Sequence, residues 1–109
     1  MLEPGRKWPR YVDLKFEDQS FDLIYTNVYD HALYPDKFCA EMLRVVRPGG
    51  FILINFQVAQ KGDKYSVTHV SNPSEEVLPL LPGCEVRLNM PISENVHAMD
   101  WELLVQKLA

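Results

Sequence analysis

The stretch FCAEMLRVVRPGGFILIN, residues 38–55, decides the fold, because a helical pattern changes to a strand pattern within it. Its first part carries apolar side chains at helical spacing, namely Phe38, Cys39, Met42, Val45 and Val46. Pro35 suits the first helical position. Pro48 cannot continue a helix, and the glycines after it tolerate a left-handed exit. We therefore expect a helix over residues 35–47 that stops at Pro48.

The charged residues of this helix fall on the side opposite the apolar stripe. Lys37 and Glu41 are spaced for an (i, i+4) ion pair, which stabilises a helix modestly. We expect Arg44 and Arg47 to form part of a solvated face.

Strands are predicted on both sides of the helix. Residues 51–56, FILINF, are apolar on both parities, which is typical of a parallel strand buried on both faces. Residues 21–26, FDLIYT, follow a turn and are rich in β-formers. Residues 21–57 therefore predict a βαβ unit, preceded by an irregular lead-in over residues 1–20.

A second helix and two further strands are expected after residue 58. Asn72 is the predicted N-cap, Pro73 takes the first helical position and Glu75 completes a capping box. Pro79 should shorten this helix. Residues 84–92 and 101–108 then indicate an antiparallel pair, and residues 21–109 a single domain.

Composition narrows the class of protein. The 109 residues are 47% hydrophobic and 24% charged, as in one globular domain. A net charge of −4 argues against nucleic-acid and membrane binding, and the basic residues near Trp8 are expected to be a solvated tail. Two cysteines and no signal-peptide pattern predict an intracellular, cytoplasmic protein. His31, His69 and His97 show no ligand spacing with either cysteine, so no metal site is expected.

Three segments of the chain carry a resemblance to a known family. They are FEDQSFDLI at residues 16–24, DHA at 30–32 followed by PDKF at 35–38, and EMLRVVRPGG at 41–50. In this order and spacing they resemble the C-terminal half of a class I S-adenosylmethionine-dependent methyltransferase domain. Residues 58–109 are similar to it only in the order of expected elements. The resemblance implies a partial Rossmann-like α/β fold of about four strands, parallel except for a C-terminal antiparallel strand, with two main helices.

The resemblance also implies S-adenosylmethionine as the cofactor of the complete fold. In the family, residues just past the strand at 21–26 lie near the transferred methyl, which makes Asn27, with Thr26 before it, the favoured cofactor-binding candidate. His31 stands where many members place a histidine near cofactor or substrate. Asp13 corresponds to an acidic residue that accepts a hydrogen bond from the adenine amine, although Asp13 lies closer to Ser20 than that residue does in the family. Structural roles remain open, since Asn27 is equally suited to end a strand and His31 to start a helix. No catalytic residue is identified.

The glycine-rich half of the family's cofactor site is missing from this sequence. The five glycines are Gly5, Gly49, Gly50, Gly62 and Gly83, and none of them forms a G-x-G turn. Such a turn lets the backbone approach the cofactor closely. The resemblance therefore implies a truncated domain that binds little or no S-adenosylmethionine alone.

The expected topology leaves one face of the sheet uncovered. Right-handed crossovers that advance in one direction place both helices on the same face, yet the two strands are apolar on both. The strand at 21–27 also presents an open edge. We expect a homodimer or a complementary protein chain to dock there.

Three functions remain open from the sequence. The first is a portion of a methyltransferase whose chemistry belongs to the complete domain. The second is a non-catalytic interaction module built on the partial fold. The third is an unrelated α/β ligand-binding domain, which the helix-to-strand motif disfavours.

Overall fold

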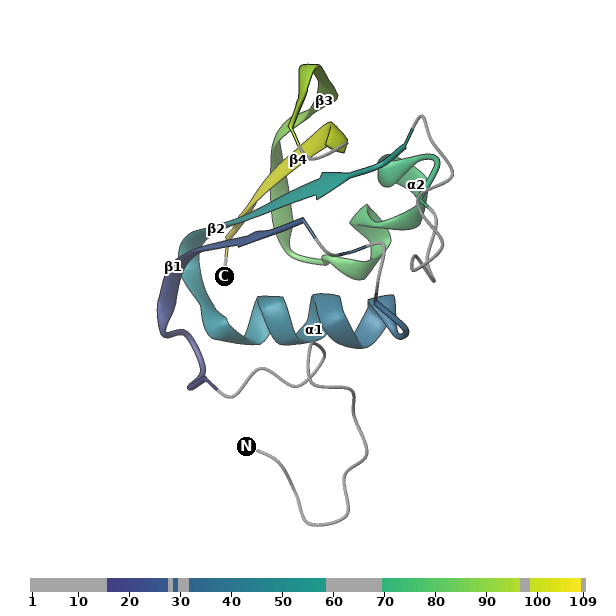
Figure 1. The fold of residues 1–109 in the computed structure, drawn as a ribbon. Helices are drawn as coiled ribbons and strands as arrows, with labels where there is room; N and C mark the ends of the chain where they lie inside the picture. The colour runs from purple at the N-terminus through teal and green to yellow at the C-terminus, as the bar shows by residue number, and fades with distance from the viewer. Residues whose placement is uncertain (1–15, 28, 30–31, 59–69, 97–98, 109) are drawn as a thin grey trace.

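Seven elements follow one another in the structure (Figure 1). This computed structural model describes residues 16–27, 29, 32–58, 70–96 and 99–108, without the side chains of residues 93–96. The elements are β1 (Phe21–Thr26), α1 (Pro35–Val45), β2 (Val46–Phe56), α2 (Pro73–Glu76), the 3₁₀ turn η2 (Leu78–Leu80), β3 (Cys84–Val96) and β4 (Met99–Lys107). The expected order of strand, helix, strand, helix and two strands is confirmed.

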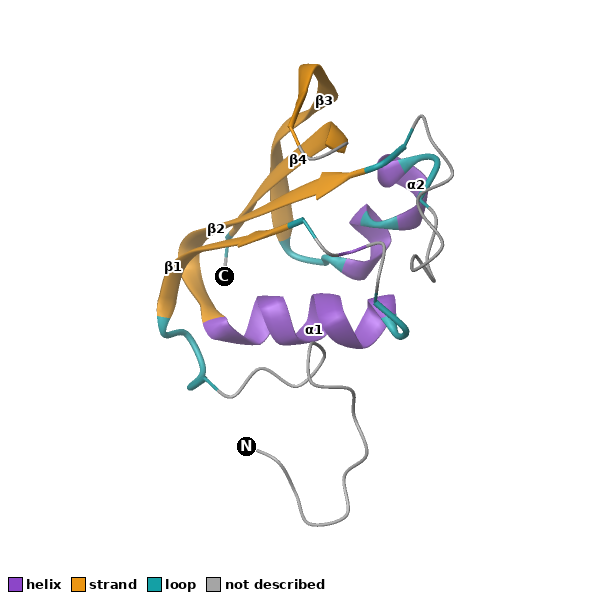
Figure 2. Cartoon of the chain, in the orientation of Figure 1, coloured by secondary structure: helices purple, strands orange, loops and turns teal. Residues whose placement is uncertain are grey.

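The four strands form one mixed sheet in the order β1-β2-β4-β3 (Figure 2). β1 and β2 are parallel, and β4 is antiparallel to both of its neighbours. β3 therefore runs parallel to β2, and the chain returns to insert β4 between them. The predicted α/β class, with two helical segments and a C-terminal antiparallel strand, is confirmed.

The helix α1 ends at Val45, two residues before the predicted end at Arg47. Val46 already pairs with Phe21 in the sheet, so strand pairing ends the helix before Pro48 is reached. Pairing then resumes at Leu23 with Phe51, and Pro48-Gly49-Gly50 forms an irregularity inside β2 rather than a helix stop.

Glycine is required at two positions of this irregularity. Gly49 has a φ of +86°, a conformation that side chains with a Cβ rarely adopt. A Cβ on Gly50 would lie 2.7 Å from Val46 Cγ1 and 2.8 Å from the Asp22 carbonyl oxygen. The pair of glycines thus lets β2 pack closely against β1.

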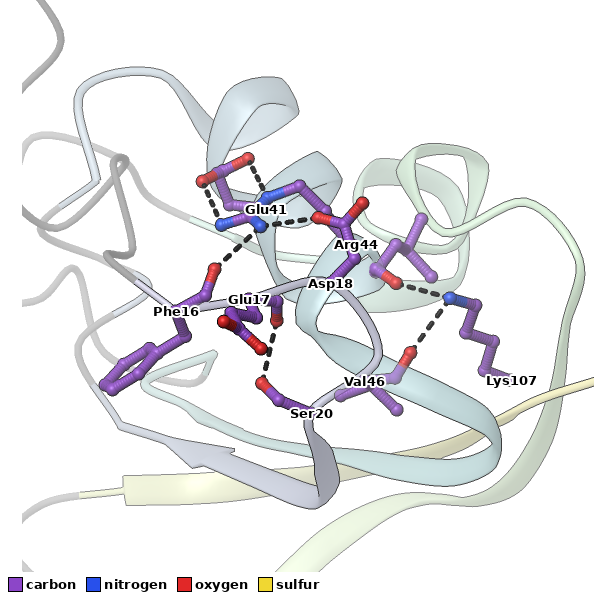
Figure 3. Close-up of polar contacts among 9 residues, drawn as sticks. Phe16, Glu17, Asp18, Ser20, Glu41, Arg44, Val46 and Lys107 are labelled. Carbon is purple, nitrogen blue, oxygen red and sulfur yellow. Dashed lines mark hydrogen bonds and ion pairs between the residues drawn. The ribbon is translucent and has the colours of Figure 1, made fainter. Parts of the chain in front are cut away.

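Arg44 joins residues 16–18 to the helix α1 (Figure 3). This corrects the prediction that Arg44 forms part of a solvated face. Its guanidinium donates to both carboxylate oxygens of Glu41 at 3.0 and 3.1 Å. It also donates to Asp18 Oδ1 at 2.7 Å and to the Phe16 carbonyl at 2.8 Å. These hydrogen bonds, to Glu41 first and then Asp18, raise the pKa of Arg44. Glu41 is therefore engaged by Arg44, whereas the sequence predicted a pair with Lys37.

Arg47 pairs with Asp22 at the start of β1, and its side chain stays 51% exposed, in keeping with the predicted solvated face. Asn72 caps α2 as predicted, accepting from the Ser74 backbone N–H at 3.1 Å. Glu76, not Glu75, reaches back, and its carboxylate accepts from the Asn72 N–H at 2.6 Å. α2 is only four residues long, because Pro79 diverts the chain into η2.

The core lies between the helices and one face of the sheet. It combines buried side chains of α1, of the α2–η2 segment, of β2 and of β4, among them Phe38, Met42, Val77, Leu81, Ile52, Ile54, Phe56, Leu103 and Val105. Both helical segments therefore cover the same face, as the crossover rule predicted.

The opposite face of the sheet, here called the open face, leaves apolar side chains exposed. Leu23, Tyr25, Leu88 and Met90 are between 39% and 54% exposed, and Phe51, Leu53 and Leu104 are half-buried. No described element packs over these residues. Among the described strands, β1 also ends the sheet on one side.

Candidate functional site

Polar side chains collect where the parallel strands β1 and β2 end. Thr26 pairs with Ile54, so Asn27 and residues 55–57 emerge at the same edge of the sheet. Ligands of open α/β sheets bind at this carboxyl edge. The Val58 N–H donates to Asp100 Oδ1 at 2.6 Å, which ties the end of β2 to the start of β4.

Tyr29 anchors the segment that follows β1. Its side chain is fully buried, with its ring 5.2 Å from that of Phe56 and 6.0 Å from that of Phe38, centroid to centroid. Cys39 Sγ donates to the Tyr29 hydroxyl at 3.7 Å. Burial raises the pKa of both groups, that of Cys39 to about 11, so the thiol stays protonated near neutral pH. This pair is part of the core and offers no nucleophile to the site.

The four residues predicted to bind cofactor have different surroundings. Asn27 is half-buried at the carboxyl edge, and its side chain has no hydrogen-bond partner among the described residues. Thr26 is buried, on the helix-covered face that it shares with Ile54. His31 and Asp13 lie outside the described residues. The structure therefore brings Thr26 and Asn27 to the expected edge and makes Asn27 the accessible one.

A hydrogen-bonded group on the open face reaches the same edge, and its members were not among the cofactor-binding candidates predicted from the sequence. The Tyr25 hydroxyl donates to Asn55 Oδ1 at 2.8 Å. Asn55 Nδ2 lies 3.4 Å from both the Trp101 carbonyl oxygen and Glu102 Oε1. Asn55 is buried although it faces no helix, because Tyr25 and Glu102 flank it. The available signal was a lone asparagine in the apolar strand 51–56.

The described glycines lie away from the carboxyl edge. Gly49 and Gly50 lie at the start of β2, at the end of the sheet opposite to Asn27. Gly83 precedes β3, where its φ of +76° serves the turn. No described glycine therefore opens the backbone at the carboxyl edge.

Two kinds of feature are absent from the described residues. No group of three or more His, Cys, Asp and Glu side chains in residues 16–27, 29, 32–58, 70–96 and 99–108 is arranged to hold a metal ion. None of the helices in the described part of the chain has the length and hydropathy needed to cross a bilayer.

Part of the chain matches a known family, and solved structures have a similar fold. Residues 10–54 match the sequence profile of a family described as methyltransferase domain. No curated protein matches the chain. The match covers β1, α1 and most of β2, the elements that build the carboxyl edge.

Solved structures resemble this chain over nearly all of its length. A SAM-dependent methyltransferase from Methanosarcina mazei is 16% identical over 94% of this chain and 66% of its own, with a TM-score of 0.67. One from Aquifex aeolicus is 18% identical over 92% of this chain and 53% of its own, with a TM-score of 0.62. The [4+2]-cyclase SpnF is 16% identical over 93% of this chain and 54% of its own, with a TM-score of 0.68.

These structures show which fold the chain has and how much of each solved protein it matches. The chain spans 53% to 66% of the length of these three proteins, so each has a substantial part that this chain does not match. One of the three is named as a cyclase, so similar folds support different chemistries.

Proposed function

Because the chain has the sequence signature and the fold of part of a methyltransferase domain, we propose that it is a portion of an S-adenosylmethionine-dependent methyltransferase. The observation that carries the proposal is the place of the family match. Residues 10–54 contain β1, α1 and most of β2, whose carboxyl ends bring Asn27 and Asn55 to one edge. In methyl transfer the protein contributes mainly by positioning the reactants and excluding water.

This portion is not self-sufficient in cofactor binding. Asn27 supplies one available amide at the edge, but the chain has no glycine-rich turn to approach the nucleotide. A complementary segment that supplies this turn would complete the site. Among the described strands β1 ends the sheet, and such a segment would continue the sheet beside it.

A titration of the isolated chain with S-adenosylmethionine, followed by backbone amide NMR shifts, tests the proposal. We expect no saturable binding at micromolar concentration and weak shifts at about millimolar concentration, a binding free energy of only about −4 kcal/mol. The shifts should centre on Thr26, Asn27 and Gln57, and Asn27→Ala should remove them. Gln106→Ala is the matched control, because this amide lies at the other end of the sheet and should leave the shifts unchanged.

Two results would contradict the proposal in different ways. Saturable micromolar binding would show that the chain holds the cofactor without a glycine-rich turn. Shifts that are insensitive to Asn27→Ala, or absent at millimolar concentration, would remove the carboxyl edge from the cofactor site.

The second candidate is a non-catalytic interaction module. The observation that favours it is the exposure of Leu23, Tyr25, Leu88 and Met90 on the open face. Under this function the Asn27 edge would give no shifts with S-adenosylmethionine at any concentration, so the same titration separates the two candidates.

A further inference from the structure

The open face is ordered in three rows of side chains that cross the strands. The strand register places Tyr25, Leu53, Leu104 and Leu88 in the middle row. The row toward the start of β2 contains Leu23, Phe51, Gln106 and Glu85, and the row toward the carboxyl edge contains Asn55, Glu102 and Met90. The centre is therefore apolar apart from the Tyr25 hydroxyl, and the charged groups lie at the two ends.

One end holds an Arg87–Glu85 ion pair whose guanidinium stays partly exposed, and the other end holds the carboxylate of Glu102. At the first end, Arg87 donates to Gln106 Oε1 at 3.0 Å and contacts Glu85 at 3.0 Å, while its side chain remains 46% exposed. At the other end, Glu102 accepts only the 3.4 Å contact from Asn55 and has no ion pair among the described residues. A guanidinium has five donors, so Arg87 can bind a further carboxylate.

We propose that the open face is a self-association surface, on which a second copy of the chain stacks about a two-fold axis that crosses the strands. This axis places the middle row on the middle row of the second copy and each end row over the opposite end row. Arg87 then lies near Glu102 of the second copy, and the same contact occurs twice. Face-to-face packing of twisted sheets brings such faces about 10 Å apart, with side chains interdigitating.

The size of the face predicts a weak dimer. Four strands about 4.8 Å apart, each paired over about six residues of about 3.3 Å, give a face of roughly 400 Å². Two such faces bury roughly 800 Å², which is below the usual size of a stable interface and within the range of transient ones. Association is therefore expected only at tens to hundreds of micromolar, and it requires no cofactor.

Exchanging the charges of Arg87 and Glu102 tests whether these two residues face each other in the proposed dimer. Sedimentation equilibrium of the whole chain without cofactor, over about 5 to 500 μM, should show a monomer–dimer equilibrium. Arg87→Glu and Glu102→Arg should each raise the dimer dissociation constant about tenfold, because like charges then face each other. The double variant should return the constant to within about threefold of the original, since the pair is restored in reverse. Glu75→Arg, an exposed charge reversal on the helix side, is the matched control and should have no effect.

Circular dichroism of each variant confirms that the fold is retained, so a change in association reports the interface. A monomer at every concentration would overturn the proposal and leave the open face to a complementary segment. Two other results would also overturn it: a dimer dissociation constant that neither single reversal changes, or a double variant that associates as weakly as the single variants. These readouts contain no S-adenosylmethionine, so they do not depend on the proposed function.

Discussion

Lys107, the last residue of β4, closes the carboxyl end of α1. Its ammonium donates to the carbonyl oxygens of Leu43 at 2.6 Å and of Val46 at 2.9 Å (Figure 3). The last carbonyls of a helix have no partner within it, and the helix dipole favours a cation there. One side chain therefore satisfies two orphan acceptors and joins the end of the chain to its central helix.

Replacing this lysine should destabilise the fold more than its position near the C-terminus suggests. We expect Lys107→Met to lower the free energy of unfolding by about 1–3 kcal/mol, because two charge-assisted hydrogen bonds are lost. Lys37→Met, an exposed lysine of the same helix, should change it by less than about 0.5 kcal/mol. Urea unfolding of both variants measures the difference. Equal losses would mean that the capping contacts contribute nothing specific.

The buried thiol of Cys39 makes stability depend on alkaline pH. Burial raises its pKa to about 11, whereas an ordinary thiol titrates near about 8.5. The folded state therefore favours the neutral thiol, and this contribution is fully present below about pH 8.5 and is lost as the pH rises toward the folded pKa.

We expect the free energy of unfolding to fall between about pH 9 and 11, by up to about 1.4 kcal/mol per pH unit from this group. Cys39→Ala should be less stable at pH 7 but lose stability less steeply over this range. The measurement is urea unfolding of both proteins at several pH values. Because other groups titrate there too, the difference between the two curves is the quantity to compare, and parallel curves would remove Cys39 as a cause.

At the scale of elements, α1 owes its stability to its apolar stripe. Phe38 and Met42 are 4% and 1% exposed and pack in the core, whereas the Lys37 side chain is about half exposed. Helix propensity alone contributes little to an 11-residue helix, so packing of this face must supply most of the stabilisation.

We expect Phe38→Ala and Met42→Ala each to lower the free energy of unfolding by about 2–5 kcal/mol, because each leaves a cavity in the core. Lys37→Ala should cost less than about 0.5 kcal/mol. Denaturant melts of the three variants provide the comparison. A Lys37 variant as unstable as the other two would show that the helix buries a different face.

In the molecule as a whole, the described helical segments cover only one face of the sheet. A parallel pair such as β1 and β2 is usually buried on both faces, yet both helical segments pack on one. Leaving a large apolar side chain in water forgoes about 1.5–3 kcal/mol, which is substantial against a typical stability of about 5–15 kcal/mol. The open face is therefore the surface on which we propose that a second copy of the chain stacks.

The elements and their order could be predicted from the sequence, because the signals for them are local. The stripe at residues 38–46 predicted α1, the apolar run at 51–56 predicted the core of β2, and Asn72 predicted the cap of α2. Topological reasoning from these elements also predicted that both helical segments share a face. The position of Asn27 at the carboxyl edge could be predicted, because it directly follows a strand, whereas the hydrogen bonds of Asn55 could not. The role of Asn27 in cofactor binding stays a prediction.

Contacts between residues far apart in the chain could not be predicted in this way and are visible only in the folded protein. There β4 inserts between β2 and β3, α1 ends at Val45, and Arg44 is an anchor rather than the expected surface residue. Lys107 and Leu43 are 64 positions apart, and Tyr25 and Asn55 are 30. A local pattern records the period and the breakers of one element, but a hydrogen bond across the sheet depends on strand register, which forms only when the whole core packs.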